Sequence, residues 1–123
     1  MRLAIIDGDS EKVPRLYSSL VDLEVPCDLF SDIVEANDNL ECTGSSWSDC
    51  GLDGVLYNPG VMGLAEARRF EPRVSPVPIG VLTVDPMDYL NSEFAVFRYS
   101  DAEGIKKHFA NVKMLRECAL SSR

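Results

Sequence analysis

The sequence predicts an α/β fold in which a five-stranded, doubly wound parallel sheet carries helices on both faces. Short, nearly continuous apolar runs alternate with longer segments whose apolar residues recur at helical spacing. This alternation is typical of parallel sheets, because the helix that crosses over between two parallel strands covers one face of the sheet. The 123 residues, 46% of them hydrophobic, are enough for a single domain with its own core over residues 1–123.

The N-terminal strand and helix give the clearest local signals. Residues 2–6 form an apolar run closed by Asp-Gly-Asp, which favours a buried strand that delivers acidic groups to its carboxyl end. Ser10 can cap the next helix, in which Pro14 lies near the first turn, where a missing N–H costs least. The helix is expected to reach about residue 20. Its predicted inward positions are Val13, Tyr17, Leu20 and Val21.

The middle of the chain continues the alternation around one polar loop. In order, its predicted elements are a strand over residues 25–30, a weakly patterned helix over 32–40, a strand over 54–57 and a helix over 63–70. The second of these helices would turn Leu64, Ala67 and Phe70 toward the sheet. The loop at residues 42–51 holds Trp47, which is expected either to anchor a partner or to fold back over the sheet edge.

The C-terminal third predicts two more strands and a long final helix. Residues 77–84 and 94–97 are the fourth and fifth strands. Only fifteen positions separate Thr83 from Arg98, so the helix that Pro86 opens is expected to be a stub around residues 87–90. A capping box over residues 100–103 starts the final helix. Its predicted inward positions are Ile105, Phe109, Val112 and Leu115.

Composition and charge exclude several functional classes. Twelve basic against twenty acidic side chains give a formal net charge of -8, which disfavours direct binding of nucleic acid. No apolar run approaches the roughly 18 residues of a membrane span, and the first residues are too short for a signal peptide, so a cytoplasmic location is expected. The four cysteines lack Cys-x-x-Cys spacing and a nearby histidine, so no metal or other cofactor is expected, and a Cys42–Cys50 disulfide is a minor alternative.

Polar residues follow the predicted strands at the edge where a doubly wound sheet gathers its function. These residues are Asp7, Asp9, Asn58, Thr83 and Arg98. The motifs around them are IIDGDS at residues 5–10, DGVLYN at 53–58, PGVMGL at 59–64, GVLT at 80–83 and FR at 97–98. With these motifs in this order, the chain resembles the receiver domains of two-component response regulators over nearly its whole length, which implies the flavodoxin-like fold of the CheY-like family.

The resemblance implies a phosphorylation site that this chain retains only in part. In the family, an acidic pair after the first strand holds a divalent cation and an aspartate after the third strand accepts the phosphoryl group. Here Asp7 matches the first acid, Gly8 stands in the place of the second, and Asp9 follows one position later. Asn58 stands at the acceptor when the strands are aligned, whereas alignment on the following Pro-Gly would place Val55 there. Neither residue has the carboxylate that an acyl phosphate requires.

The remaining receiver positions are altered as well. Thr83 matches the Ser or Thr after the fourth strand, although its hydroxyl could equally bond a nearby carbonyl. Arg98 replaces the lysine after the fifth strand, and is expected to bridge to Asp7 or to the Asn58 oxygen as a structural pair. Ala95 stands where the family often has an aromatic switch residue.

The expected function is therefore that of a pseudo-receiver, a non-enzymatic and phosphorylation-independent interaction module of a two-component phosphorelay system. Its partner would be another protein or a second copy, bound through the last strand and helix over residues 94–120. One alternative is a receiver that responds to a ligand or a proton through Asp7 and Asp9. A further alternative is a phosphatase remnant, because the segment IIDGD loosely resembles the Asp-x-Asp motif of haloacid dehalogenase-like phosphatases.

Overall fold

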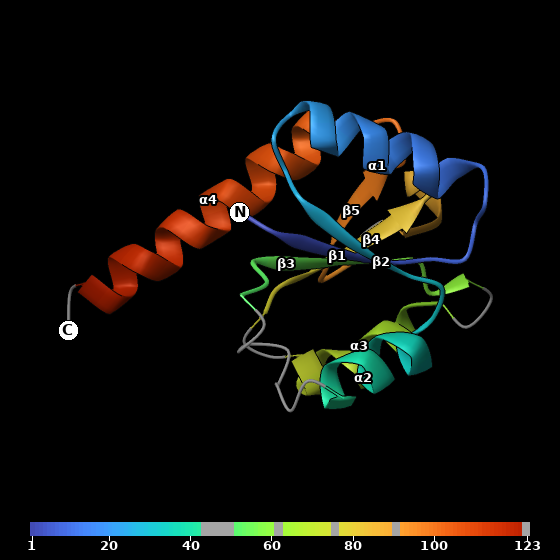
Figure 1. Cartoon of the computed structure of the whole chain (residues 1–123), viewed down its shortest axis with the longest axis horizontal. Helices are drawn as coiled ribbons and strands as arrows, with labels where there is room; N and C mark the ends of the chain where they lie inside the picture. The colour runs from blue at the N-terminus through green and yellow to red at the C-terminus, as the bar shows by residue number, and fades with distance from the viewer. Residues whose placement is uncertain (43–50, 61–62, 75–76, 90–91, 122–123) are drawn as a thin grey trace.

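The computed structural model describes residues 1–42, 51–60, 63–74, 77–89 and 92–121 (Figure 1). A five-stranded parallel sheet forms its centre, with the strand order β2-β1-β3-β4-β5. The strands are β1 (Leu3–Ile6), β2 (Cys27–Phe30), β3 (Gly54–Tyr57), β4 (Ile79–Thr83) and β5 (Ala95–Arg98). The predicted doubly wound, flavodoxin-like fold is thereby confirmed, and β2 and β5 are its two edge strands.

Helices cover both faces of the sheet (Figure 1). One face carries α1 (Lys12–Asp22) and α4 (Ala102–Ser121), and the other carries α2 (Ile33–Cys42) and α3 (Gly63–Val74). In the described residues between β4 and β5 the chain forms a short 3-10 helix, η2 (Pro86–Tyr89), so the predicted stub at this place is confirmed. None of the helices in the described ranges has both the length and the apolar character that crossing a membrane requires.

Alternation along the strands divides the core into two layers. On the α1 and α4 side, the buried side chains include Leu3, Ile5, Leu16, Leu20, Leu56, Leu82, Ile105 and Phe109. On the α2 and α3 side, they include Ala4, Ile6, Ala36, Val55, Ala67, Phe70, Val74 and Val81. Because β1 and β3 contribute alternate residues to both layers, both strands are buried throughout.

Phe109 holds α4 against the sheet through two glycines. A Cβ atom at Gly54 would overlap the Phe109 ring, and one at Gly80 would lie 3.2 Å from Phe109 Cζ. The ring is fully buried and also lies beside Phe97, with 6.2 Å between the two centroids. The missing side chains in β3 and β4 therefore make the room that lets α4 lie close to the sheet.

The start and the inward face of α1 differ from the prediction. Asp9, rather than Ser10, satisfies the first turn, because its Oδ1 accepts hydrogen bonds from the backbone N–H groups of Glu11 and Lys12, each at 2.8 Å. The buried positions are Val13, Leu16 and Leu20. Tyr17 and Val21 are exposed because they face the side of α1 that lies beyond the edge strand β2, where no further strand covers them.

The C-terminal end of α1 closes in a Schellman motif. Val25 N–H donates to the Leu20 carbonyl at 2.8 Å and Glu24 N–H to the Val21 carbonyl at 2.9 Å. Glu24 has a φ angle of 64°, in the left-handed region that glycine usually occupies at this position. A glutamate here accepts a backbone conformation that costs an L-residue about 1 kcal/mol or more.

The predicted capping box and inward face of α4 also need correction. The N-cap is Asp101, whose Oδ1 accepts a hydrogen bond from the Gly104 N–H at 3.1 Å, in place of the Ser100–Glu103 pairing. Ile105 and Phe109 are buried as predicted, but Leu115 is exposed. The reason is length, since the 20 residues of α4 span about 30 Å and the four- and five-residue strands only about 13–17 Å. The C-terminal half of α4 therefore extends beyond the sheet (Figure 1).

The remaining elements match the prediction in type and order, with shifted ends. β2 begins at Cys27 rather than Val25, and β5 runs from Ala95 to Arg98 rather than from Phe94 to Phe97. α3 continues four residues past Phe70 to Val74, which lengthens its buried face. The loop position of Trp47 and its neighbour Cys50 lies outside the described residues.

Candidate functional site

The carboxyl edge of the sheet brings together three side chains from three strand ends. Asp7 follows β1, Asn58 follows β3 and Tyr99 follows β5. The Tyr99 hydroxyl donates a hydrogen bond to Asp7 Oδ2, and Asn58 Nδ2 donates to the Tyr99 hydroxyl oxygen at 2.6 Å. Asn58 Nδ2 also lies 3.4 Å from Asp7 Oδ2. We call these three residues the Asp7–Asn58–Tyr99 cluster.

Backbone hydrogen bonds fix two members of this cluster. The Asp7 N–H donates to the Phe30 carbonyl at 3.0 Å, and the Asn58 N–H donates to the Ile6 carbonyl at 3.3 Å. The side-chain oxygen of Asn58 accepts the Gly60 N–H at 2.8 Å, in a turn where Gly60 has a φ angle of 59°. Both polar atoms of the Asn58 amide are therefore engaged inside the protein.

Tyr99 remains protonated in this setting. Burial raises the pKa of its hydroxyl, and the hydrogen bond to the Asp7 carboxylate raises it further. The Lys12 ammonium lies 6.0 Å from the centre of the Tyr99 ring, at the limit of a cation–π contact. A neutral phenol between a carboxylate and an amide can donate to one and accept from the other, as it does here.

Asp9 points away from the cluster, toward the start of α1. Its Oδ2 accepts a hydrogen bond from Lys12 Nζ at 2.8 Å while Oδ1 accepts the two backbone N–H groups of the first turn. The Lys12 side chain, followed by those N–H groups, lowers the pKa of Asp9 to about 2. Asp9 therefore stays ionised at neutral pH as a helix-capping residue, and it does not join Asp7 in a shared pocket.

Thr83 is buried and hydrogen-bonded to the backbone, whereas Arg98 is exposed. The Thr83 hydroxyl lies 3.3 Å from the Asp85 carbonyl and accepts the Asp85 N–H at 3.2 Å, which fits the bonded-hydroxyl interpretation. Arg98 is exposed, and within the described ranges its side chain forms neither an ion pair nor a hydrogen bond with Asp7 or Asn58. The predicted bridge from Arg98 is therefore wrong, and Tyr99 makes the connection instead.

Ala95 lies far from these polar groups along β5. It begins the strand, pairs with Gly80, and packs against the α1 and α4 core layer. The residue that sequence reasoning missed is Tyr99. Its signal was an aromatic side chain with a polar tip in the turn directly after the last strand, where such a tip needs a partner when it is buried.

The described residues include no group of three or more His, Cys, Asp and Glu side chains arranged to hold a metal ion. Of the two acids near the edge, Asp7 is bonded to Tyr99 and Asp9 to Lys12. Cys27 and Cys118 are free thiols, and burial raises the pKa of Cys27 to about 11, which keeps it protonated and unreactive. Among the described residues, the side chains at this edge join strand ends, and their polar groups are bonded to one another or to the backbone.

No protein-family model matches the chain, and no curated protein matches it.

Proposed function

We propose that the protein is a pseudo-receiver, a module that uses the receiver-like fold for protein association and carries no phosphoryl chemistry. The observation that supports this most strongly is Asn58, because the end of β3 is where a receiver needs a carboxylate. Its amide is held by Gly60, Tyr99 and Asp7, so it joins three strand ends. Asn58 stands at the position aligned with the phosphoacceptor, and its side-chain amide is already used in these hydrogen bonds.

The acidic residues support the same conclusion. A magnesium site commonly combines one or two carboxylates with phosphate oxygens in near-octahedral geometry. Asp7 offers one carboxylate, which already accepts the Tyr99 hydroxyl, and the Asp9 carboxylate caps α1 and pairs with Lys12. Binding a cation here would require breaking these contacts first, which lowers the affinity by their free energy.

Exposed apolar side chains support an interaction role. Val84 and Met87, at the end of β4 and in η2, are 66% and 64% exposed. Met114 and Leu115 on α4 are 56% and 66% exposed. Single exposed apolar residues are ordinary, whereas groups of them on adjoining elements are typical of partner surfaces. Both pairs belong to or adjoin the C-terminal region that the sequence predicted as the partner-binding side.

The proton-responsive alternative loses support at Asp9. A group with a pKa of about 2 does not titrate in the physiological range. The phosphatase alternative needs a second acid that can donate a proton, and Asp9 is held as a carboxylate by Lys12 and the start of α1.

The test is phosphoryl transfer measured by intact mass. Wild-type protein is incubated with acetyl phosphate and magnesium, alongside an active receiver domain as the positive control. We expect no added phosphoryl group on the wild type, and little on Asn58→Asp, because Gly8 still lacks the second carboxylate and Tyr99 still occupies Asp7. Stoichiometric phosphorylation of a wild-type carboxylate at this edge would overturn the proposal.

A further inference from the structure

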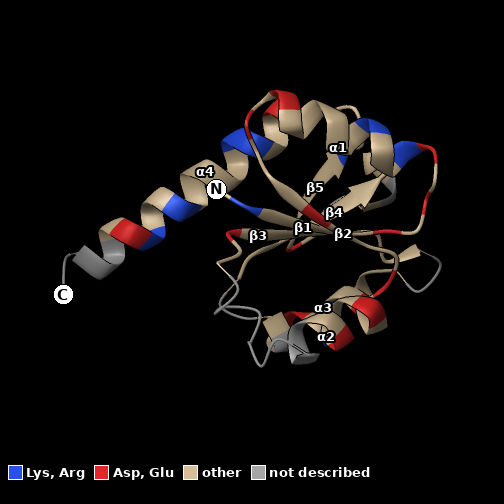
Figure 2. Cartoon of the chain, viewed as in Figure 1, with Lys and Arg blue, Asp and Glu red and all other residues tan. Residues whose placement is uncertain are grey.

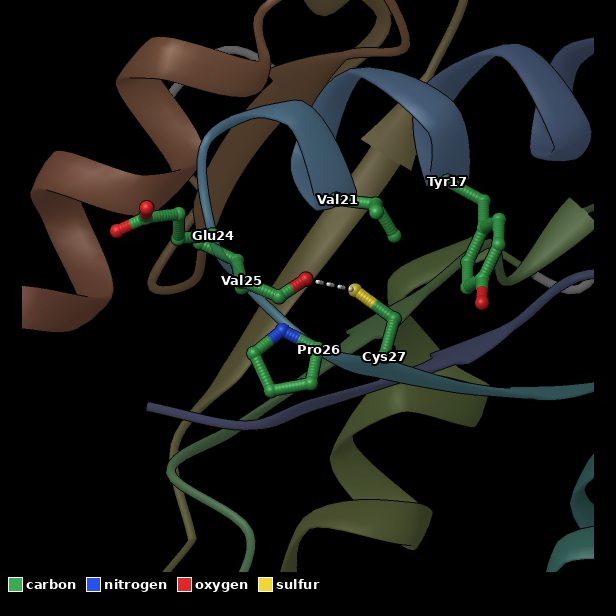
Figure 3. Close-up of a pocket in the computed structure, with 6 residues that line it drawn as sticks. All are labelled: Tyr17, Val21, Glu24, Val25, Pro26 and Cys27. Carbon is green, nitrogen blue, oxygen red and sulfur yellow. Dashed lines mark hydrogen bonds between the residues drawn. The ribbon is translucent and has the colours of Figure 1, made fainter.

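The outer side of α1 and the edge strand β2 form an apolar hollow. It has a volume of about 360 Å³ and is lined by Tyr17, Val21, Glu24, Val25, Pro26 and Cys27 (Figure 3). Tyr17 and Val21 extend from α1 toward β2, and the Cys27 thiol donates a hydrogen bond to the Val25 carbonyl at 3.5 Å (Figure 3). Leu29, two residues further along β2 and therefore on the same face, is 42% exposed and extends the apolar surface. We call this surface the α1–β2 hollow.

At the rim of the hollow lies Glu24, a residue with an acidic side chain and an unfavourable backbone conformation. Glu24 has a φ angle of 64° at a helix end where glycine would fit without strain. Its side chain points outward from the hollow, on the side away from Tyr17 (Figure 3). Backbone strain at a non-glycine residue is an observation from which a functional hypothesis can be drawn. The residue that occupies this strained position is Glu24, whose carboxylate places a negative charge beside the exposed apolar surface.

The C-terminal half of α4 is a second surface without a cover among the described residues. Phe109 is fully buried, whereas Met114 and Leu115 are mostly exposed. This half leaves the sheet near Lys113, whose Nζ lies 3.5 Å from Asp53 Oδ2. On a helix, Met114 and Arg116 flank Leu115 at about 100° on either side. Leu115 is therefore the centre of a surface with an apolar flank and a basic flank.

We propose that the C-terminal half of α4 from one copy of the chain binds in the α1–β2 hollow of a second copy, reciprocally. Leu115 would insert beside Tyr17 and Val21, and Arg116 would approach Glu24. This inference rests on the proposed function, because it names the partner and the contact surface of the interaction module.

Charge complementarity favours a second copy as the occupant. The chain has a formal net charge of -8, yet the C-terminal half of α4 contains the basic residues Lys113 and Arg116 against the single acid Glu117. Basic residues recur along α4 as it leaves the domain, while acidic residues mark the end of α1 and the start of β2 (Figure 2). Among the described elements, α4 thus combines the apolar and the basic character that the hollow requires.

The exposed border of the hollow, rather than its volume, favours a side chain over a separate ligand. Small-molecule pockets occupy about 300–1,000 Å³ and enclose most of their ligand. The α1–β2 hollow is at the lower end of that range and is bordered by the exposed side chains Tyr17 and Val21. A single anchoring side chain with contacts around it suits such a surface.

Sedimentation equilibrium from micromolar to near-millimolar concentration tests the proposal. We expect a reversible dimer, weakened about tenfold or more by Leu115→Glu and by Val21→Glu, each of which places a charge in the contact. Val34→Glu is the matched control, since Val34 and Leu115 are 67% and 66% exposed and Val34 lies on α2, on the other face of the sheet. Thermal unfolding of each variant checks that it remains folded.

A charge exchange tests the pairing at the rim. Glu24→Arg and Arg116→Glu should each weaken the dimer about two- to fivefold, and the double variant should restore it. A monomer at all concentrations, a dimer that Val21→Glu leaves intact, or equal weakening by Val34→Glu would overturn the inference. Those results leave the phosphoryl-transfer measurement unchanged, so failure here is distinguishable from failure of the pseudo-receiver proposal.

Discussion

The carboxyl edge of the sheet and the outer side of α1 and α4 differ in how their side chains are partnered. At the edge, Asp7, Asn58 and Tyr99 bond to one another, and Thr83 bonds to the backbone of Asp85. On the outer side, the apolar residues Tyr17, Val21, Met114 and Leu115 lie exposed. The polar side chains at the carboxyl edge are thus hydrogen-bonded within the protein, whereas exposed apolar side chains lie on α1 and α4. This difference supports the proposal that the protein acts through association rather than through phosphoryl chemistry.

The two halves of α4 offer the largest contrast in stability. Phe109→Ala should lower the free energy of unfolding by about 3–5 kcal/mol, because it leaves a cavity between α4, β3 and β4. Leu115→Ala, on the same helix, should change it by no more than about 0.5 kcal/mol. Urea denaturation at a concentration where the protein is monomeric measures both. Equal losses in the free energy of unfolding would contradict the finding that only the N-terminal half of α4 packs against the sheet.

The second contrast concerns the Tyr99 hydroxyl. Tyr99→Phe should lower the free energy of unfolding by about 1–2 kcal/mol, because Asp7 and Asn58 both lose a hydrogen-bonding partner. Tyr17→Phe makes the same chemical change at an exposed position on α1 and should have almost no effect. If the two variants unfold alike, the Asp7–Asn58–Tyr99 cluster does not stabilise the carboxyl edge.

Replacing Glu24 with glycine is expected to affect the stability of the monomer and its self-association in opposite directions. Glu24→Gly should stabilise the monomer by about 0.5–1 kcal/mol, because glycine adopts the left-handed conformation without strain. Glu24→Ala is the matched control, since it also removes the carboxylate but keeps the strained conformation. Both variants should weaken self-association to the same degree, while only the glycine variant becomes more stable. A more stable glycine variant with unchanged association would separate Glu24 from the interface.

The smallest effect concerns the pH dependence of stability through Asp9. Its pKa falls from 3.8 to about 2 in the folded protein, so its contribution is fully present above about pH 4 and disappears as the pH falls through 2. Asp9→Asn should be less stable than the wild type at neutral pH, and the gap should close toward pH 2. Thermal unfolding across this range measures it. A gap that persists undiminished at pH 2 would contradict the assigned role of the carboxylate.

Much of the fold follows from the sequence because its signals are local. The apolar runs over residues 2–6, 54–57 and 77–84 predict the central strands, and the strand ends then place Asp7 and Asn58 at one edge. The exposure of Leu115 could not be predicted in this way. Its apolar spacing continues along the helix after the sheet beneath it has ended, and only the relative lengths of helix and strands show this.

The sequence predicts where the site lies, but not which side chains are hydrogen-bonded to one another there. The family resemblance directed attention to Arg98, the last residue of β5, whereas the next residue, Tyr99, reaches Asp7. A shift of one residue reverses the direction of a side chain near a strand end, and the path of the following turn decides which one faces the edge. That turn is closed by the Asp101 N–H bond to the Arg98 carbonyl at 3.1 Å, which the apolar pattern of the sequence does not predict. The inward face of α1 was misjudged by the same small shift, with Leu16 buried and Tyr17 exposed.

The most direct test of the central claim is a two-dimensional NMR titration of the labelled protein with magnesium and a phosphate analogue. We expect the backbone amides of Asp7, Asp9, Asn58 and Tyr99 to shift no more than they do with sodium chloride at equal ionic strength, because the side chains that a ligand would need are already hydrogen-bonded within the protein. Saturable shifts confined to these amides, abolished by Asp7→Asn, would contradict it and would show that the carboxyl edge still binds the ligands of a phosphoryl switch.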